Sequence, residues 1–304
     1  MATRDAYGKA LVEFGGKYDF VVLDADLAAA TKTCNFKKEF PDRFFDCGIA
    51  EGNMMSVAAG IAATGQLVFA SSFAMFAAGR AFEQVRNSIG YPHLNVKIGA
   101  THAGITVGED GATHQCNEDI ALMRTIPGMT VICPADAVSA RAAVEAAILH
   151  NGPVYMRFGR ANVPMIYGDD YKFEIGKGTV LADGKDVTIV ATGITVFMAL
   201  EAREKLAAEG VDAAVIDIST IKPIDAELLV EYAKKTGKIV TCEEHSIIGG
   251  LGGAVSEVLS EKCPTKVKRV GINDTFGSSG KAFEVAAAYG ISAESIYGAV
   301  KEIL

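Results

Sequence analysis

Two histidines and two acids lie within one glycine-containing segment, THAGITVGEDGATHQ (residues 101–115). His102, Asp110 and His114 can donate hydrogen bonds to hydroxyls or a phosphate, move protons near neutral pH, or bind a metal ion. The twelve-residue spacing of the histidines matches no familiar metal-binding pattern, so we predict no metal site on this chain. Glycines let the backbone bend closely around a ligand. The alternative is a loop whose histidines only cap nearby backbone groups.

Glu51 precedes the longest uncharged run of the chain, Gly52 to Gly79. The ordinary explanation is a carboxylate at a helix N-terminus, where free N–H groups and the helix dipole stabilise it. A functional interpretation is that Glu51 has almost no charged residue close by in sequence with which it could form an ion pair. Such surroundings favour a protonated carboxyl, which could hold its proton against a ring nitrogen of a ligand.

Two further segments could contact a ligand. Phe73 and Phe76 lie where a predicted strand turns into a helix, and a planar ligand could stack there, although aromatic residues at this spacing usually pack into a core. The segment GGLGG (249–253) opens a predicted helix and could bind an anion. It lacks the GxGxxG pattern and the later acidic residue of dinucleotide sites, so we expect tight packing of helix against strand.

Short β-rich runs alternate with helical patterns along the whole chain, which is typical of βαβ units on parallel sheets. The predicted strands are 20–26, 44–49, 66–71, 95–102, 130–135, 153–158, 187–193, 211–219, 238–244 and 266–272. The predicted helices include 74–89, 137–149, 195–209, 225–236 and 251–261. We therefore expect an α/β protein with two doubly wound domains and mainly parallel sheets.

The looser segment before residue 179 contains Gly, Pro and acidic residues, and we predict domains at 1–165 and 179–304 joined by a linker at 166–178. Ligands of parallel sheets bind beyond the carboxyl ends of the strands. Polar or aromatic candidates follow five strands of the first domain, which makes this domain the expected site of chemistry. They are Asp26, Glu51, Phe73, His102 and Arg160.

Composition excludes several classes of protein. The 304-residue chain has a net charge of -8 and no cluster of Lys or Arg, which argues against binding to nucleic acid. Its N-terminus has charges where a signal peptide needs an apolar centre. The Gly52–Gly79 run is long enough to span a membrane, but its polar residues and the Thr64-Gly65 turn indicate helix, turn and strand. Six scattered cysteines without CxxC pairs indicate reduced thiols and a cytoplasmic protein.

Several segments of the chain resemble those of a known protein family. The segments DCGIAEGNMMSVAAGIAATG, SSFAMF, THAGITVGEDGATHQ and MRTIPGMTVICPADA look like the pyrimidine-binding domain of transketolases. STIKPID and EEHSIIGGLGGAVSEVL resemble the C-terminal domain of that family, so the resemblance covers essentially the whole chain. A transketolase also has an N-terminal domain that binds the diphosphate of thiamine diphosphate and its Mg²⁺ through a GDG…N motif. This sequence has no GDG and resembles the C-terminal subunit of a split transketolase.

The resemblance implies partners and cofactor contacts. A separate N-terminal subunit would bind most of the Mg²⁺ and diphosphate, in an assembly with two copies of each chain. Glu51 matches the glutamate that hydrogen-bonds the aminopyrimidine ring and favours the tautomer that removes the proton of the thiazolium carbon. Phe73 and Phe76 resemble the aromatic wall of the aminopyrimidine pocket. Asp26 matches an acid near the cofactor.

Further matches lie on the substrate side of the family's site. His102 and His114 resemble the histidines that contact substrate hydroxyls and phosphate, and Asp110 resembles the acid that binds a hydroxyl next to the carbonyl. Arg4 and Arg160 resemble the arginines that bind sugar phosphate, a role that suits a planar fork of donors.

Two positions depart from the family pattern. The family usually has a tyrosine three residues after the second aromatic residue of the wall, and here the position is Gly79. Part of the pocket would then be open or filled by another group. The family often has a serine beside the substrate phosphate, where this chain has Ala30 followed by Thr31. Phosphate affinity would be weaker, or Thr31 would substitute.

The resemblance implies transfer of a two-carbon ketol unit from a ketose phosphate to an aldose phosphate, with His102 and His114 moving protons. Three alternatives stay open. In 1-deoxyxylulose-5-phosphate synthase the corresponding loop is shorter and has arginine in place of His102. The beta subunits of 2-oxoacid dehydrogenases lack the GEDGATHQ pattern. A non-catalytic paralogue that regulates a partner is the third, and the retained Glu51, Asp110 and histidines argue against it.

Overall fold

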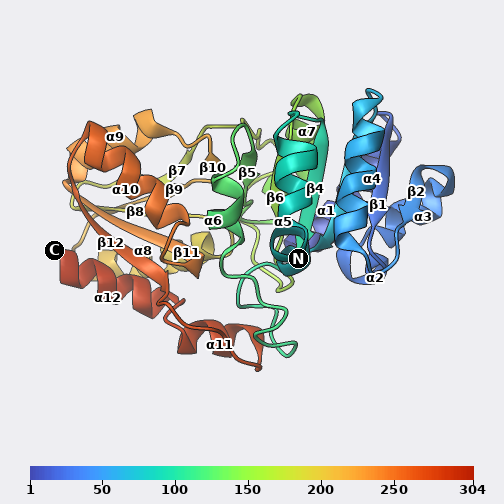
Figure 1. The fold of residues 1–304 in the computed structure, drawn as a ribbon. Helices are drawn as coiled ribbons and strands as arrows, with labels where there is room; N and C mark the ends of the chain where they lie inside the picture. The colour runs from blue at the N-terminus through green and yellow to red at the C-terminus, as the bar shows by residue number, and fades with distance from the viewer.

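The computed structural model describes residues 1–304 and shows two sheets, each with helices on both faces (Figure 1). The first sheet has seven strands in the order β10-β5-β6-β4-β3-β1-β2, and all neighbours are parallel except β10 and β5. Its strands are β1 (Phe20–Asp24), β2 (Phe44–Asp46), β3 (Leu67–Phe73), β4 (Val96–Thr101), β5 (Thr130–Ile132), β6 (Val154–Arg157) and β10 (Thr220–Lys222).

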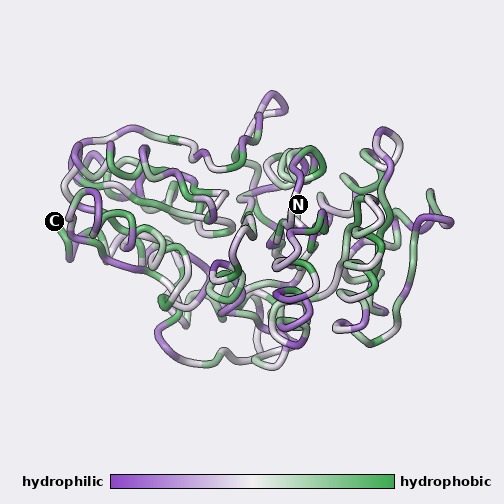
Figure 2. Tube along the Cα trace, turned by 45° about the horizontal axis from the view of Figure 1, so that its top comes forward, coloured by the Kyte–Doolittle hydropathy of each residue, from purple (hydrophilic) through white to green (hydrophobic).

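Separate apolar clusters fill the two faces of this sheet. One face carries α1 (Thr3–Gly15), α3 (Cys34–Glu39) and α7 (Ala137–Leu149). The other carries α4 (Glu51–Ala63), a π-helical turn (Met75–Arg80), α5 (Phe82–Gln84), a second π-helical turn (Val85–Gly90) and α6 (Asp119–Arg124). Figure 2 shows hydrophobic residues mixed with hydrophilic ones along the chain, and the hydrophobic side chains of these helices pack on the sheet. None of the helices combines the length and apolar character of a membrane-spanning segment.

The second sheet has five strands in the order β12-β11-β8-β9-β7, and only β7 runs antiparallel to its neighbour. Its strands are β7 (Thr179–Ala182), β8 (Val187–Ala191), β9 (Ala213–Asp217), β11 (Lys238–Ser246) and β12 (Lys266–Ile272). One face is covered by α8 (Thr195–Ala208), α11 (Ala282–Ala288) and α12 (Ala293–Ile303), the other by α9 (Ala226–Thr236) and α10 (Leu251–Lys262). The predicted fold class, two α/β units with mainly parallel sheets, is confirmed.

Two local features differ from the sequence-based expectation. The helix expected at 74–89 is not a regular α-helix, because the two π-helical turns interrupt it. Gly79, a poor helix former, lies in the first of these turns, and the side chain of Met75 folds over it. The short strand β10 was not expected, and it pairs with β5, Thr220 opposite Ile132. The second half of the chain thereby extends the first sheet.

The segment GGLGG at the start of α10 has a packing role, as predicted. The buried Glu243 carboxylate accepts hydrogen bonds from the backbone N–H groups of Leu251 (2.6 Å) and Gly252 (2.8 Å). A Cβ atom at Gly250 would collide with the same carboxylate. The free N–H groups of this helix terminus are therefore bound by the protein's own acid and not by an external anion.

A buried polar network joins the two sheets. The Arg157 side chain at the end of β6 donates to Asp119 Oδ2 on α6 (2.8 Å) and to the backbone oxygen of Glu244 on β11 (2.8 Å). Tyr155 O–H also donates to Asp119 (2.8 Å). Arg157 and Asp119 are 4% and 0% exposed, so this ion pair is shielded from water.

Lys97 on β4 is fully buried without an acidic partner. Its ammonium donates to the backbone oxygens of His150 (2.8 Å) and Gly152 (2.6 Å). Burial lowers the pKa of Lys97 from 10.5 to about 7.

This shift predicts that the free energy of unfolding depends on pH through Lys97. Between pH 7 and 10 the unfolded chain keeps the lysine proton that the folded chain has lost, so the wild type gains stability as the pH rises. Relative to Lys97→Met, we expect a gain of about 1 kcal/mol per pH unit. Urea unfolding of both proteins at pH 7.5, 8.5 and 9.5 measures it. A difference that does not change with pH would contradict this origin of the dependence.

Candidate active site

Most of the predicted site residues lie beyond the carboxyl ends of the strands of the first sheet. Four rings form one wall there. Phe73 and Phe76 are stacked, with centroids 5.9 Å apart and an interplanar angle of 10°. His102 stacks on Phe73 at 3.7 Å, and His114 meets the face of Phe76 edge-on at 5.5 Å. The structure therefore brings these four residues together, although they come from two different segments of the chain.

His102 is held in one tautomer by its neighbours. Arg4 Nη1 lies 2.7 Å from Nε2, and the Thr101 hydroxyl lies 2.9 Å from Nδ1. A guanidinium can only donate, so Nε2 accepts and the ring proton resides on Nδ1. Burial, followed by the charge of Arg4, lowers the pKa of His102 to about 3. Because Nε2 is already bonded to Arg4 in this arrangement, the expected role of His102 in moving protons requires that Arg4 first leave, and it stays a prediction.

His114 has a freer environment. It is half-buried, and its only side-chain partner is the Thr113 hydroxyl, 2.9 Å from Nδ1. Nε2 is left for a ligand. Of the two histidines, His114 is the one whose ring can exchange a proton with a bound molecule without first breaking a contact to arginine.

Arg4 and Arg160 approach the same region from α1 and from the loop after β6. Arg4 also donates to the backbone oxygen of Ala30 (3.3 Å), and Arg160 donates to Glu109 (2.9 Å). Burial, and in addition the charge of Arg160, lowers the pKa of Arg4. Two guanidinium groups that repel one another favour an anion between them.

Asp110 and Asp26 are both exposed, and neither side chain has a hydrogen-bond partner in the protein. The backbone of Asp26 is in the left-handed region, with φ of 61°, and its N–H donates to Asp46 (3.1 Å). Asp26 makes no hydrogen bond or ion pair with the other predicted site residues, and its expected place near a cofactor stays a prediction.

Thr31 does not point into the site. It is fully buried, and its hydroxyl donates to Asp24 Oδ2 (2.7 Å), which also accepts from Thr33 (2.8 Å). Burial raises the pKa of Asp24. The expectation that Thr31 could replace the missing serine is therefore wrong, because Asp24 already binds its hydroxyl. Sequence reasoning did not identify Asp24, a buried strand residue whose partners follow seven and nine positions later.

Glu51 is the first residue of α4 and is 2% exposed. Its Oε2 accepts a hydrogen bond from Arg80 Nη1 (3.1 Å), so the expectation of a carboxyl without a charged partner is wrong. The first π-helical turn brings Arg80 to Glu51 across 29 positions of sequence. The available signal was that Arg80 is the first charged residue after the neutral run.

A hollow of about 650 Å³ adjoins this pair. Met75, Phe76 and Arg80 line one side of it. Segments 112–118 and 276–277 line the rest. The side chain of Met75 folds over Gly79. It lies where the family pattern would have the side chain of a tyrosine. Glu51 does not line the hollow, because the Arg80 side chain lies against its carboxylate.

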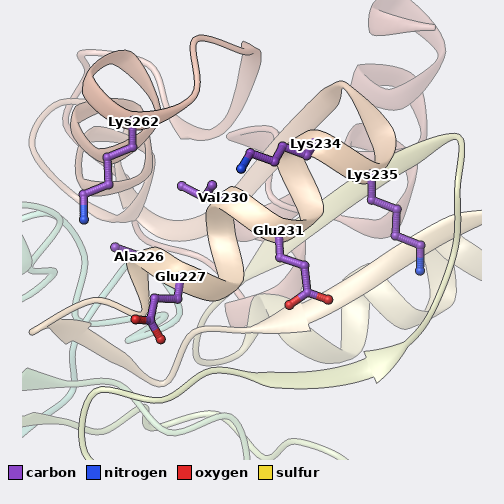
Figure 3. A pocket seen from close by; sticks show the side chains of 7 residues that line it. All are labelled: Ala226, Glu227, Val230, Glu231, Lys234, Lys235 and Lys262. Atoms are coloured by element: carbon purple, nitrogen blue, oxygen red, sulfur yellow. The ribbon is translucent and has the colours of Figure 1, made fainter.

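Another hollow, of about 670 Å³, lies over α9 in the second half of the chain (Figure 3). Its walls carry the side chains of Glu227, Glu231, Lys234, Lys235 and Lys262. It contains none of the predicted site residues, and its lining combines exposed side chains of both charges with Ala226 and Val230. We therefore place the candidate site beside Phe76 and not over α9.

Comparisons with known proteins agree with the resemblance seen in the motifs. The family model "Transketolase, pyrimidine binding domain" matches residues 1–165, and "Transketolase, C-terminal domain" matches residues 176–296. A protein of Methanocaldococcus jannaschii, described provisionally as a transketolase C-terminal section, is 53% identical over 98% of this chain and 95% of its own length. The 6-deoxy-6-sulfo-D-fructose transketolase subunit of a Clostridium species is 44% identical over 99% of this chain and 94% of its own.

A solved structure is also similar along its whole length. It is described as a split gene transketolase in an inactive beta4 tetramer, and it is 57% identical with a TM-score of 0.94. The match covers 100% of this chain and 98% of that chain.

Proposed function

Because this chain belongs to the transketolase family, we propose that it is the C-terminal subunit of a two-chain, thiamine diphosphate-dependent transketolase. It would transfer a two-carbon ketol unit from a ketose phosphate to an aldose phosphate. The observation that carries the proposal is the buried Glu51 carboxylate, which Arg80 connects to Phe76 in the wall of four rings. A buried acid next to stacked aromatic rings suits a planar ring that offers an N–H donor.

The residues present fit thiamine diphosphate at its pyrimidine end. Glu51 would hydrogen-bond the ring nitrogen, and Phe73 and Phe76 would form the wall on which the ring stacks. When bound, the cofactor supplies the carbon nucleophile that carries the two-carbon unit. The protein's task is to hold the pyrimidine in the tautomer that takes up the proton, and a water-excluded carboxyl does this better than an exposed one.

The substrate would lie between the rings and the arginines. Arg4 and Arg160 would bind its terminal phosphate, and the neutral His102 would hydrogen-bond a hydroxyl once Arg4 turns to the phosphate. His114 would move a proton at the reacting carbonyl through its free Nε2. Asp110 would accept from the hydroxyl next to that carbonyl. With Ala30 in place of serine and the Thr31 hydroxyl bound by Asp24, the arginines have no hydroxyl donor beside them.

The diphosphate and Mg²⁺ would be bound mainly by a separate N-terminal subunit, with two copies of each chain in the assembly. The similar split gene transketolase is described as inactive in its beta4 tetramer, and we propose that the chain described here depends on a partner subunit for activity.

Mixing experiments test this function. We expect ketol transfer only when this chain is combined with the N-terminal subunit that carries the GDG…N motif, thiamine diphosphate and Mg²⁺. A coupled assay with a ketose phosphate donor and an aldose phosphate acceptor measures it. Each chain alone, with the same cofactors, is the control. A mixture that binds the cofactor and transfers no ketol unit to a range of aldose phosphates would contradict the proposal.

A further inference from the structure

Arg80 meets Glu51 and Phe76 at the same time. Its guanidinium donates to Glu51 Oε2 at 3.1 Å, and its central carbon lies 5.3 Å from the centroid of the Phe76 ring. A planar group that donates N–H to a carboxylate and lies over an aromatic ring has the two contacts that the proposed function gives to the aminopyrimidine.

We propose that the Arg80 guanidinium occupies the aminopyrimidine's place on Glu51 in the isolated chain and leaves it when thiamine diphosphate binds. This inference rests on the proposed function. It goes beyond it because it assigns a role to a residue outside the family motifs, and because it makes the apparent affinity for the cofactor depend on an internal competitor.

The two partners differ in how freely they can move. Glu51 is 2% exposed and fixed in the first turn of α4. Arg80 is 58% exposed, and its hydrogen bond to Glu51 is the only one its side chain makes. It ends a π-helical turn beside Gly79, which has no side chain to hold it, and the 650 Å³ hollow gives it room. The guanidinium can therefore leave without any change in the backbone of α4.

The Arg80–Glu51 ion pair has opposite effects on the stability of the isolated chain and on the binding of the cofactor. In the isolated chain, Arg80 compensates a carboxylate that is shielded from water and would otherwise be costly. For the cofactor, a conformation that blocks Glu51 lowers the apparent affinity by the fraction of molecules that are free to bind. Removing Arg80 should therefore make the isolated chain less stable and make the assembled complex bind the pyrimidine more tightly.

The test uses Arg80→Met in the two-chain complex, with thiamine diphosphate and Mg²⁺ titrated in a calorimeter. We expect the Kd of the cofactor to fall about tenfold and the Tm of the isolated chain to fall as well. Arg86→Met is the matched control, because Arg86 is exposed on the next π-helical turn and pairs with no acid. Arg80→Gln keeps a neutral donor for Glu51 and gives a second variant should the methionine variant not fold.

An unchanged affinity for thiamine diphosphate in both Arg80 variants would overturn the inference, because Arg80 would then not compete with the cofactor. A weaker affinity would overturn it too, because Arg80 would then help to bind the cofactor. Wild-type complex that binds no thiamine diphosphate would overturn both the inference and the proposed function. Tighter cofactor binding by Arg80→Met in a complex that transfers no ketol unit would overturn the proposed function and support the inference.

Discussion

Glu51→Gln in the assembled two-chain complex is expected to lower kcat by about 10³-fold or more, while the complex still assembles. Glutamine has nearly the same shape as glutamate, but it cannot exchange a proton with the ring nitrogen. The pyrimidine would lose the interaction that selects its reactive tautomer, which corresponds to about 4 kcal/mol of activation free energy. Steady-state kinetics at saturating thiamine diphosphate and Mg²⁺ measure the effect.

The matched control is Glu83→Gln. Glu83 is exposed on the neighbouring helix α5, and its carboxylate accepts only from the side chains of Gln84 and Asn87. Its substitution should leave kcat within a factor of two, by analogy with other surface changes. A Glu51→Gln complex that keeps a tenth or more of the wild-type kcat would remove Glu51 from its proposed role.

The order of strands and helices along the chain could be predicted from the sequence because it depends on local patterns. Helix α7 illustrates this: Asp136 and Ser139 form a reciprocal N-cap, and the helix spans 137–149 as predicted. Strands buried on both faces, such as β3 and β4, appear as short apolar runs whose length alone separates them from helices. Their limits agree with the prediction within two residues.

The features that could not be predicted from the sequence depend on contacts between residues that are far apart in the chain. The three residues of β10 are too few to form a pattern, and they are a strand only because β5 offers an unpaired edge. The pairing of Glu51 with Arg80 requires the extra residue of a π-helical turn, which no periodicity predicts.

The same limit applies to the candidate site. Residue types and strand ends predicted that Phe73 and His102 gather at one edge of the sheet, and they do. Arg4, which only the family resemblance singled out, lies against His102. The direction of each side chain was not predictable. Thr31 turns toward Asp24, which lies seven positions earlier on β1, and so leaves the place expected for a phosphate ligand. A motif gives the position of a residue, whereas its hydrogen-bond partner decides what that residue can do.

The second large effect is expected in the buried network between the sheets. Asp119→Ala should lower the free energy of unfolding by about 3–5 kcal/mol, because it leaves the shielded Arg157 guanidinium without its carboxylate partner. The two backbone oxygens that also accept from Arg157, those of Cys116 and Glu244, cannot replace a negative charge. Urea unfolding of the isolated chain, followed by circular dichroism, measures the loss.

Two comparisons decide whether the loss comes from the uncompensated charge. Glu257→Ala breaks the other ion pair made by α6, Arg124–Glu257 (2.6 Å), whose glutamate is 65% exposed, and it should cost less than about 1 kcal/mol. The double variant Asp119→Leu with Arg157→Met removes both charges and should be more stable than Asp119→Ala alone. If the double variant is the less stable of the two, the network stabilises the contact between the sheets by its hydrogen bonds and not merely by avoiding an unpaired charge.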